Sequence, residues 1–598
     1  MSEFTRNWPA PNSGPKRHSW KDMSEDPPVD VMPCSNDEYF PLPPTKAQLR
    51  IMELANAETE RMRRRFRMTR AQFVRTAAAT AIGFWAIDAV RGGRFGSYGW
   101  AATDSRDACD LEWDGKKGAE SLLNLPGEFI FDVQSHHVDP HGMWRVTNPA
   151  IHAFFAAIWP QSSAVTGGKP GLRKDGSLRG GGAGEIDPIE NLSRFHYLKE
   201  IFLDSATTAS VLSVVPTSPD TNNPLPIHEA EVTATTVNEL ARSNRTVMHA
   251  FVMPNRGSAG NTTPHAKPLY LDEELQMMVD RASKYRSLLR GWKTYCAWGD
   301  VPYASGWFLD SDTGLAFLEQ VKKVSREFPE VPPVVATHKG FALPGFDQRA
   351  ASPRDVGPAA RQNPDVQFLI YHSGYDNTDA DNKYDVQKPY AGDSNVKSDT
   401  RSVDAFIKSL RENHWDATKF VEPGKKFGNV PNVYAELGSV WRNVMHDPDQ
   451  SAHLLGKLIT YVGPKQIAWG TDSLWYGSPQ PEIVGLRRFE FSDRGKELYG
   501  LPYGLEGDVE DPTQKAPSPD RTIRNGILGR NAARAYRVDP DAQRNAISCD
   551  AVNDLRKDSY ISQLGTERES APLASHMAPG ARTRREVLKG LKEGPWSP

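Results

Sequence analysis

The sequence predicts an α/β fold, a TIM-like (β/α)8 barrel with an N-terminal arm and helix and a C-terminal extension. Short β-rich runs recur eight times from residue 128 onward, and segments of helical composition lie between several of them. Regular alternation of strand and helix is typical of a parallel sheet, and eight repeats close a barrel. Two long insertions also follow strand ends, where barrel enzymes build their sites.

The eight expected strands are short runs rich in β-branched and aromatic residues. They are residues 128–134, 210–215, 246–253, 292–298, 333–338, 366–372, 432–438 and 466–472. Helical segments between them include LSRFHYLKEIFLDSA, EAEVTATTVNELARSN, LDEELQMMVDRASKYR and GLAFLEQVKKVSREF. We therefore expect residues 128–537 to form one barrel domain, flanked by an N-terminal region of residues 1–100 and a tail of residues 538–598.

The insertions cover residues 137–190 and 375–430. The first contains the glycine-rich run GGKPGLRKDGSLRGGGAGE, which has little apolar surface to bury. We expect that run to be a surface loop over the mouth of the barrel.

The N-terminal region combines an extended arm, residues 1–45, with a charged helix expected over residues 46–67. Seven arginines and no acid fall between Arg61 and Arg75, and the apolar stretch TAAATAIGFWAI follows. This resembles a twin-arginine export signal in which Ala71 replaces the second arginine, while Asp88 interrupts the apolar run. The alternative is an amphipathic helix that packs on the body of the protein or forms the interface of an oligomer, so the expected location is either periplasmic or cytoplasmic.

Composition excludes several classes of protein. The hydrophobic fraction of 38% is that of a globular chain. A net charge of −3 gives no basic field for nucleic acid. The four cysteines lie far apart, which argues against a disulfide scaffold or a zinc knuckle. No apolar run is long enough for an integral membrane segment.

Polar residues follow four of the expected strands directly. His136, His338 and His372 come after the first, fifth and sixth strands, and Asp472 ends the eighth. Because barrel strands direct their terminal side chains at one mouth, we expect these four to converge and to be able to share a metal ion. Asp132, Gln134 and His136 have the same parity and should face the same side.

Several blocks together resemble the amidohydrolase-related group, the second amidohydrolase family. They are FIFDVQSHHVDPH, VVATHKG, SPRDVGPAARQNPDVQFLIYHSG, NVYAEL, IAWGTDS and NGILGRNAARAY, which occur in this order over roughly residues 128–537. Members of that family include aminocarboxymuconate semialdehyde decarboxylase, resorcylate-type decarboxylases and pyrone dicarboxylate lactonase.

The resemblance implies a distorted barrel with metal ligands at the first, fifth and eighth strands. The implied set is Gln134, His136, His338 and Asp472, with Asp472 also accepting a proton from water and His372 acting as acid, base or electrophile. The chain departs from the family at Gln134, which stands where the first of two histidines is usual. An amide oxygen is a poorer zinc ligand than imidazole, so the site is weaker, holds another metal, or gains a ligand from His137 or His141.

Substrate contacts are expected from Lys293, Glu436 and Arg349, which lie at strand ends or in the adjoining loop. For each, an ordinary ion pair or solvated charge is the alternative, and a carbamylated Lys293 bridging two metals is another. Lys339 and Arg354 are weaker candidates for an anion clamp. Four tryptophans near strand ends are expected either to line a pocket or to pack in the core: Trp144, Trp159, Trp307 and Trp475.

Three functions remain open. The first is a metal-dependent hydrolase that cleaves an ester, lactone, amide or C–C bond of a small organic or aromatic acid. The second is a non-oxidative decarboxylase with the same site, and the third is a non-catalytic barrel that acts as a binding or partner subunit. The expected cofactor is a divalent ion, with zinc first and manganese or iron as alternatives. The long extensions also predict a homo-oligomer.

Overall fold

A computed structural model of the protein describes residues 29–31, 44–67, 70–74, 77–99, 128–148, 189, 192–215, 222–258, 267–299, 306–341, 347–376, 389–390, 402–414, 430–548 and 550–555. The glycine-rich run, Trp159 and most of the arm of residues 1–45 lie outside these ranges, as does the tail beyond residue 555. Our expectations for those segments are therefore not addressed by the structure.

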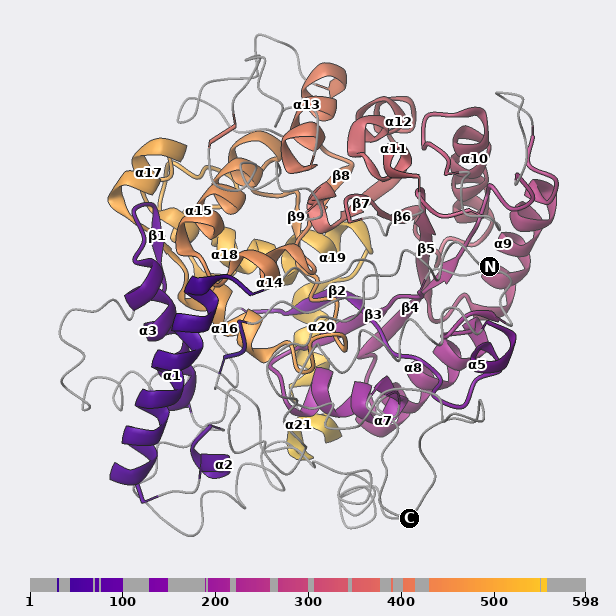
Figure 1. The fold of residues 1–598 in the computed structure, drawn as a ribbon. Helices are drawn as coiled ribbons and strands as arrows, with labels where there is room; N and C mark the ends of the chain where they lie inside the picture. Colours follow the sequence, from indigo (N-terminus) through magenta and orange to yellow (C-terminus); the bar gives the residue numbers. More distant parts are fainter. Residues whose placement is uncertain are drawn as a thin grey trace, which may run out of the picture.

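Eight parallel strands form one sheet in chain order, which confirms the predicted fold class. They are β2 (Phe131–Ser135), β3 (Ala209–Leu212), β4 (Thr246–Phe251), β5 (Leu289–Tyr295), β6 (Val334–His338), β7 (Gln367–Tyr371), β8 (Val433–Glu436) and β9 (Ile467–Ala468). Each overlaps one of the eight runs expected from the sequence. Figure 1 shows these strands at the centre of the molecule with helices around them.

The last strand returns to the first and closes the barrel. The N–H of Val133 donates to the carbonyl of Trp469 at 3.0 Å. Ser135 and Ser473 then form a parallel bridge beyond the end of β9. The register between β2 and β3 shifts between Asp132 and Ser135, so the first strand is irregular where its polar residues begin.

Helices cover the outside of the sheet. In the barrel they are α5 (Trp144–Thr147), α7 (Arg194–Tyr197), η5 (Leu198–Leu203), α8 (Ile227–Ala241), α9 (Leu271–Tyr285), α10 (Asp312–Glu327), α11 (Gln348–Ala351), η7 (Pro353–Asp355), α12 (Val356–Gln362), η8 (His372–Gly374), α13 (Ser402–His414), α14 (Val440–Val444), α15 (Pro448–Lys457), η11 (Leu458–Val462), α16 (Gln480–Arg488), α17 (Asp493–Tyr499), η12 (Gly504–Glu506), η13 (Pro519–Arg521), α18 (Ile523–Asn525), η14 (Gly526–Arg530) and α19 (Asn531–Ala535). The helices α8, α9 and α10 confirm three segments predicted to be helical, and α13 adds a helix within the second insertion.

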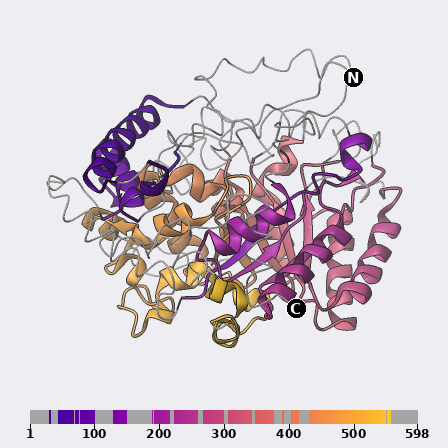
Figure 2. The same ribbon diagram turned by 90° about the horizontal axis from the view of Figure 1, so that it is seen from below.

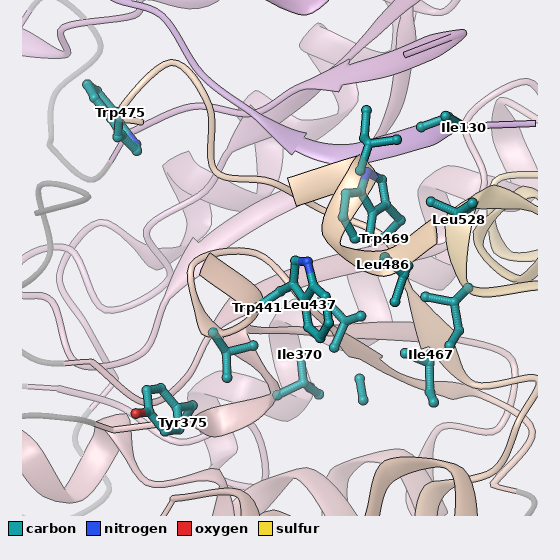
Figure 3. Close-up of a cluster of buried hydrophobic side chains, with 14 of the residues drawn as sticks. Ile130, Ile370, Tyr375, Leu437, Trp441, Ile467, Trp469, Trp475, Leu486 and Leu528 are labelled. Atoms are coloured by element: carbon teal, nitrogen blue, oxygen red, sulfur yellow. The ribbon is translucent and has the colours of Figure 1, made fainter. Parts of the chain in front are cut away.

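Apolar side chains fill the space between strands and helices. Trp441 of α14 packs against this layer with Leu437 and Ile467, and Figure 3 shows them beside Ile370 of β7. A second apolar cluster fills the interior of the barrel and includes Tyr536 after α19. The barrel is therefore a packed core, and its polar residues are confined to particular levels of the strands.

The N-terminal region packs on one flank of the barrel through α1 (Lys46–Arg65), α2 (Arg70–Phe73) and α3 (Ala77–Arg91). Figures 1 and 2 show α1 and α3 side by side. The helix α1 confirms the charged helix, which begins at a Thr45 capping box. The apolar stretch is α3, and the carboxylate of Asp88 accepts the N–H of Tyr98 at 3.1 Å. The structure thus shows the packed helix, with Asp88 as a buried hydrogen-bond acceptor.

Short elements at both ends attach to the barrel. The strand β1 (Gly96–Ser97) pairs with β10 (Glu490–Phe491) in an antiparallel pair. Two helices follow the barrel, α20 (Pro540–Ile547) and α21 (Ala551–Leu555). Asp550, which lies between them, forms a buried ion pair with Arg245. Within the described ranges, no helix is long and apolar enough to cross a membrane.

Candidate active site at the barrel rim

Gln134, His136 and Asp472 meet where β2 joins the segment after β9. Asp472 Oδ1 lies 3.0 Å from His136 Nε2. The same oxygen accepts a hydrogen bond from Gln134 Nε2 at 2.9 Å. Gln134 Nε2 and His136 Nε2 are 3.5 Å apart. Backbone bonds fix the pairing, because the N–H of Asp472 donates to the carbonyl of Gln134 at 2.8 Å.

His136 has a defined orientation. Its Nδ1 lies 2.9 Å from the carbonyl oxygen of Ser213, and a carbonyl can only accept, so Nδ1 carries a proton. In the neutral ring the lone pair is then on Nε2, which faces Asp472. The indole of Trp475 stacks on the other side of the imidazole, with ring centroids 5.6 Å apart. Trp475 therefore lines the site, as one of the two alternatives expected.

The second oxygen of Asp472 has its own partners. Ser439 Oγ donates to Asp472 Oδ2 at 2.5 Å and lies 2.6 Å from the hydroxyl of Tyr476. His372 Nε2 is 4.0 Å from the same carboxylate oxygen. Both catalytic residues expected from the sequence therefore belong to one cluster. The sequence did not single out Ser439, although it follows the β8 block directly in NVYAELGS.

The backbone of this cluster adopts a conformation that L-residues disfavour. The φ angles are +60° at Asp472, +59° at His372 and +29° at Ser439. Such angles cost about 1–3 kcal/mol each and persist where surrounding contacts enforce them. Three strained residues gathered around the Asp472 carboxylate at a barrel mouth are typical of a functional site.

His338 is brought close to His372 and lies farther along the rim from Asp472. The two imidazoles meet edge to face with centroids 4.9 Å apart. His338 Nε2 lies 2.6 Å from the carbonyl oxygen of Phe341, and Tyr295 stacks on the ring. The structure thus joins His338 to the cluster through His372.

Glu436 holds backbone groups of the site. Its Oε2 accepts the N–H of His372 at 2.8 Å, and its Oε1 accepts that of Gly438 at 2.5 Å. Burial raises the pKa of Glu436 to about 7. Asp132 is similar, since it accepts Thr471 Oγ1 at 2.5 Å and burial raises its pKa to about 8. The contacts seen for Glu436 are positioning contacts, and the substrate contact expected from the sequence stays a prediction.

Lys293 lies in the barrel interior and is fully buried. Its Nζ lies 3.5 Å from the centroid of the Tyr371 ring and 4.3 Å from that of Tyr295. Aromatic faces stabilise an ammonium through the ring quadrupole. Tyr295 also stacks on His338, so Lys293 lies one aromatic layer from the rim.

The structure does not bring Arg349 to the cluster, and its expected role in substrate binding stays a prediction. Its side chain is 81% exposed and pairs with Asp347, the N-cap of α11. The loop between β6 and β7 turns this side chain outward. Lys339 is buried and donates to Asp355 at 2.8 Å, and Arg354 lies over the ring of Phe308. These contacts are of the kind expected for the structural alternative, and anion binding by the three residues stays a prediction.

The other candidates of the first strand also point elsewhere. His137 Nε2 lies 2.8 Å from Thr233 Oγ1 on α8, and burial lowers its pKa to about 3. His141 is exposed. Trp144 donates to the carbonyl of Asp139 at 2.7 Å, and Trp307 packs against Phe317. Neither His137 nor His141 supplies the ligand that a histidine at position 134 would provide.

The donor atoms around Asp472 determine whether a metal ion fits the site. In the part of the chain that the structure describes, no group of three or more His, Cys, Asp or Glu side chains is arranged to hold a metal ion. The cluster has two such side chains, His136 and Asp472, and the amide of Gln134 is the third donor. Gln134 Oε1 is buried and has no hydrogen-bond partner among the described residues. The amide nitrogen is the atom that faces Asp472, so Gln134, His136 and Asp472 fit a divalent cation only with the amide turned to present its oxygen.

Comparisons with known proteins give distant similarities. No family model matches the chain, and no match is found among curated proteins. A 5-carboxyvanillate decarboxylase from Sphingomonas paucimobilis is 13% identical, with a TM-score of 0.35, over 69% of this chain and 99% of that chain. A 2,6-dihydroxybenzoate decarboxylase from Rhizobium is 10% identical, with a TM-score of 0.32, over 69% and 99%.

A third solved structure is a Pseudomonas putida protein assigned as a 2-pyrone-4,6-dicarboxylic acid hydrolase. It is 10% identical, with a TM-score of 0.32, and covers 68% of this chain and 97% of that chain. These values are too low to assign a family or a reaction. The barrel is established by the strand order of the chain itself.

Proposed function

We propose that the protein is a metal-dependent enzyme of the amidohydrolase type that acts on a small organic or aromatic acid. The observation that carries the proposal is the Asp472 cluster, in which residues more than 300 positions apart share one carboxylate at the barrel rim. The sequence blocks that resemble the amidohydrolase-related group support the same reaction class and supply the substrate class.

Gln134, His136 and Asp472 would hold the cation. A divalent ion bound by them would polarise a substrate oxygen and lower the pKa of bound water. Asp472 has one oxygen toward His136 and the other toward His372, so it can accept a proton on the His372 side. Ser439 fixes that second oxygen, and the carbonyl of Ser213 fixes the ring of His136.

His372 is placed to act on the reacting group. Its Nε2 lies 4.0 Å from Asp472 Oδ2, and its backbone N–H is held by Glu436. The imidazole can stabilise a developing oxyanion or deliver a proton to the leaving group. Trp475 covers His136 and keeps water from that face of the site. In hydrolysis, Asp472 would therefore accept a proton and His372 would donate one.

Non-oxidative decarboxylation is the second candidate, and the dryness of the site favours it. Gln134, His136, His372 and Asp472 are all buried, with at most 1% of each residue exposed. Loss of carbon dioxide leaves the bonding electron pair on the organic fragment and so disperses the localised carboxylate charge, and a water-excluding site favours this transition state over the ground state. In this version Asp472 would first take a proton from water and then pass it to the carbon that has lost the carboxyl group.

A substrate panel tests both versions. Purified protein loaded with Mn²⁺ or Zn²⁺ would be incubated with carboxylated aromatics and with lactones, esters and amides of small acids. The release of acid is expected for hydrolysis, and the release of carbon dioxide for decarboxylation. Metal-dependent turnover of one class establishes that reaction. The absence of turnover over the whole panel, in protein that is folded and metal-loaded, would favour the non-catalytic barrel.

A further inference from the structure

The three donors around Asp472 have the spacing of ligands that share an ion. Their separations are 2.9, 3.0 and 3.5 Å. Neighbouring ligands of a six-coordinate ion with bonds of about 2.1 Å lie about 3.0 Å apart. A lone pair on His136 Nε2 also faces a carboxylate oxygen, which is repulsive unless a proton or a cation lies between them.

The amide of Gln134 has two possible orientations, which exchange oxygen and nitrogen between the same two positions. With Nε2 toward Asp472, Oε1 is buried without a partner among the described residues. That oxygen and Glu436 Oε1 both border the space at Gly438, since a methyl group built there would come within 3.0 Å of each. Two acceptor oxygens thus face the same gap, which is unfavourable in a dry site.

Turning the amide moves Gln134 Oε1 out of the gap in which it has no donor, and it places a donor opposite Glu436. Gln134 Nε2 then donates to Glu436, whose Oε1 accepts only the N–H of Gly438 among the hydrogen bonds described and has a lone pair to spare. Gln134 Oε1 then faces His136 Nε2 and Asp472, so three lone pairs converge on one point. Such an arrangement is stable with a cation or a proton between the lone pairs, and a cation can satisfy all three at once.

We propose that Gln134 is a metal ligand through its amide oxygen, that Glu436 holds the amide in this orientation, and that the site therefore suits a hard divalent cation such as Mn²⁺. The inference rests on the proposed function and deepens it. Amide and carboxylate oxygens suit manganese, whereas imidazole suits zinc, so the donor set departs from the zinc expected from the sequence. Glu436 is accordingly a positioning residue.

Binding measurements on metal-free, full-length protein test the proposal without any substrate. Mn²⁺ affinity would be measured by electron paramagnetic resonance and Zn²⁺ affinity by competition with a chromophoric chelator. The variants are Gln134→Glu, which keeps an oxygen donor, Gln134→Met, which has no oxygen, and Gln134→His. Gln480→Met is the matched control, since Gln480 is a buried glutamine whose amide oxygen binds the N–H of Ala206. Circular dichroism verifies folding.

We expect one Mn²⁺ per wild-type chain. Gln134→Met should weaken Mn²⁺ binding by about tenfold or more, Gln134→Glu should retain or strengthen it, and Gln134→His should shift the preference toward Zn²⁺ by about tenfold. Gln480→Met should leave the affinity unchanged. Equal Mn²⁺ affinities in all variants, or no Mn²⁺ bound by wild type, would overturn the proposal. A loss in Gln134→Glu as large as in Gln134→Met would show that position 134 acts as a hydrogen-bond donor instead.

The role of Glu436 is tested by a double-mutant cycle. Glu436→Ala should weaken Mn²⁺ binding when residue 134 is Gln and have little effect when it is Glu, because a carboxylate needs no hydrogen bond to orient it. Equal effects in both backgrounds would contradict the role. If Glu436→Ala does not fold, Glu436→Gln replaces it in the same cycle. Inactivity on every substrate alongside tight Mn²⁺ binding would refute the proposed function and leave this inference standing.

Discussion

Asp472 and His136 come from opposite ends of the barrel sequence, and Asp472 Oδ1 lies 3.0 Å from His136 Nε2. The pairing depends on barrel closure, because the backbone of each residue is hydrogen-bonded to the neighbouring strand segment. The His136 ring is fixed by Ser213 and the Asp472 carboxylate by Ser439. Fold and site are therefore specified together at this edge of the sheet.

Asp472→Asn should abolish turnover. The amide keeps the size of the side chain but cannot accept a proton, and a general base contributes about 10²–10⁴-fold in rate. The measurement is kcat/KM on a substrate that wild type converts, with a thermal unfolding curve as the check on folding. Activity near the wild-type level in a folded variant would dismiss the assignment.

Two variants of Ser439 separate the effect of its backbone strain from the effect of its hydrogen bond to Asp472. Ser439→Ala and Ser439→Gly both remove the hydroxyl that holds Asp472, so both should lower kcat. Only glycine adopts the φ of +29° without a steric cost. We expect the glycine variant to exceed the alanine variant in unfolding free energy by about 1 kcal/mol, measured by denaturant titration. The reverse order would argue against strain at this position.

Asp550 should anchor the C-terminal helices to the barrel. It pairs with Arg245, and both side chains are 1% exposed. Asp550→Ala leaves a buried, unpaired guanidinium and should cost about 3–5 kcal/mol of unfolding free energy. Arg245→Met combined with Asp550→Leu should recover most of that loss, because it removes both charges. A single variant as stable as wild type would contradict the anchoring role.

Stability should fall in mild acid through His453. Burial, then Lys457, lowers its pKa to about 4, against about 6.5 in an unfolded chain. The folded protein therefore binds fewer protons than the unfolded chain between these pH values, and the unfolding free energy decreases as the pH falls through this window, by at most about 3 kcal/mol. His453→Gln should flatten the profile between pH 7 and pH 4. An unchanged acid slope in His453→Gln would assign the effect to other groups.

The strands and the residues at their ends were predictable because both follow from local pattern. Apolar runs specified all eight strands, and parallel barrel geometry placed His136, His372 and Asp472 at one mouth. His338 was placed at the correct rim, but its distance from Asp472 depends on the packing of Phe341 and Tyr295, which strand pattern does not encode.

Features that depend on loop conformation were not predictable. Arg349 follows β6 as a ligand-binding residue would, yet a local ion pair with Asp347 turns it outward. The position of Ser439 and the left-handed backbone of Asp472 depend on turn conformations that the residue types do not predict. The apolar stretch forms α3, whose packing depends on tertiary contacts such as that of Asp88 with Tyr98; the export signal suggested by the same residues stays a prediction.

A crystal structure of the protein with Mn²⁺, with anomalous data collected at the manganese edge, tests the proposed metal site most directly. We expect one strong peak between β2 and the segment after β9, about 2.2 Å from Gln134 Oε1, His136 Nε2 and an oxygen of Asp472. A map with no peak there at saturating Mn²⁺, and with Gln134 still donating to Asp472, would contradict it.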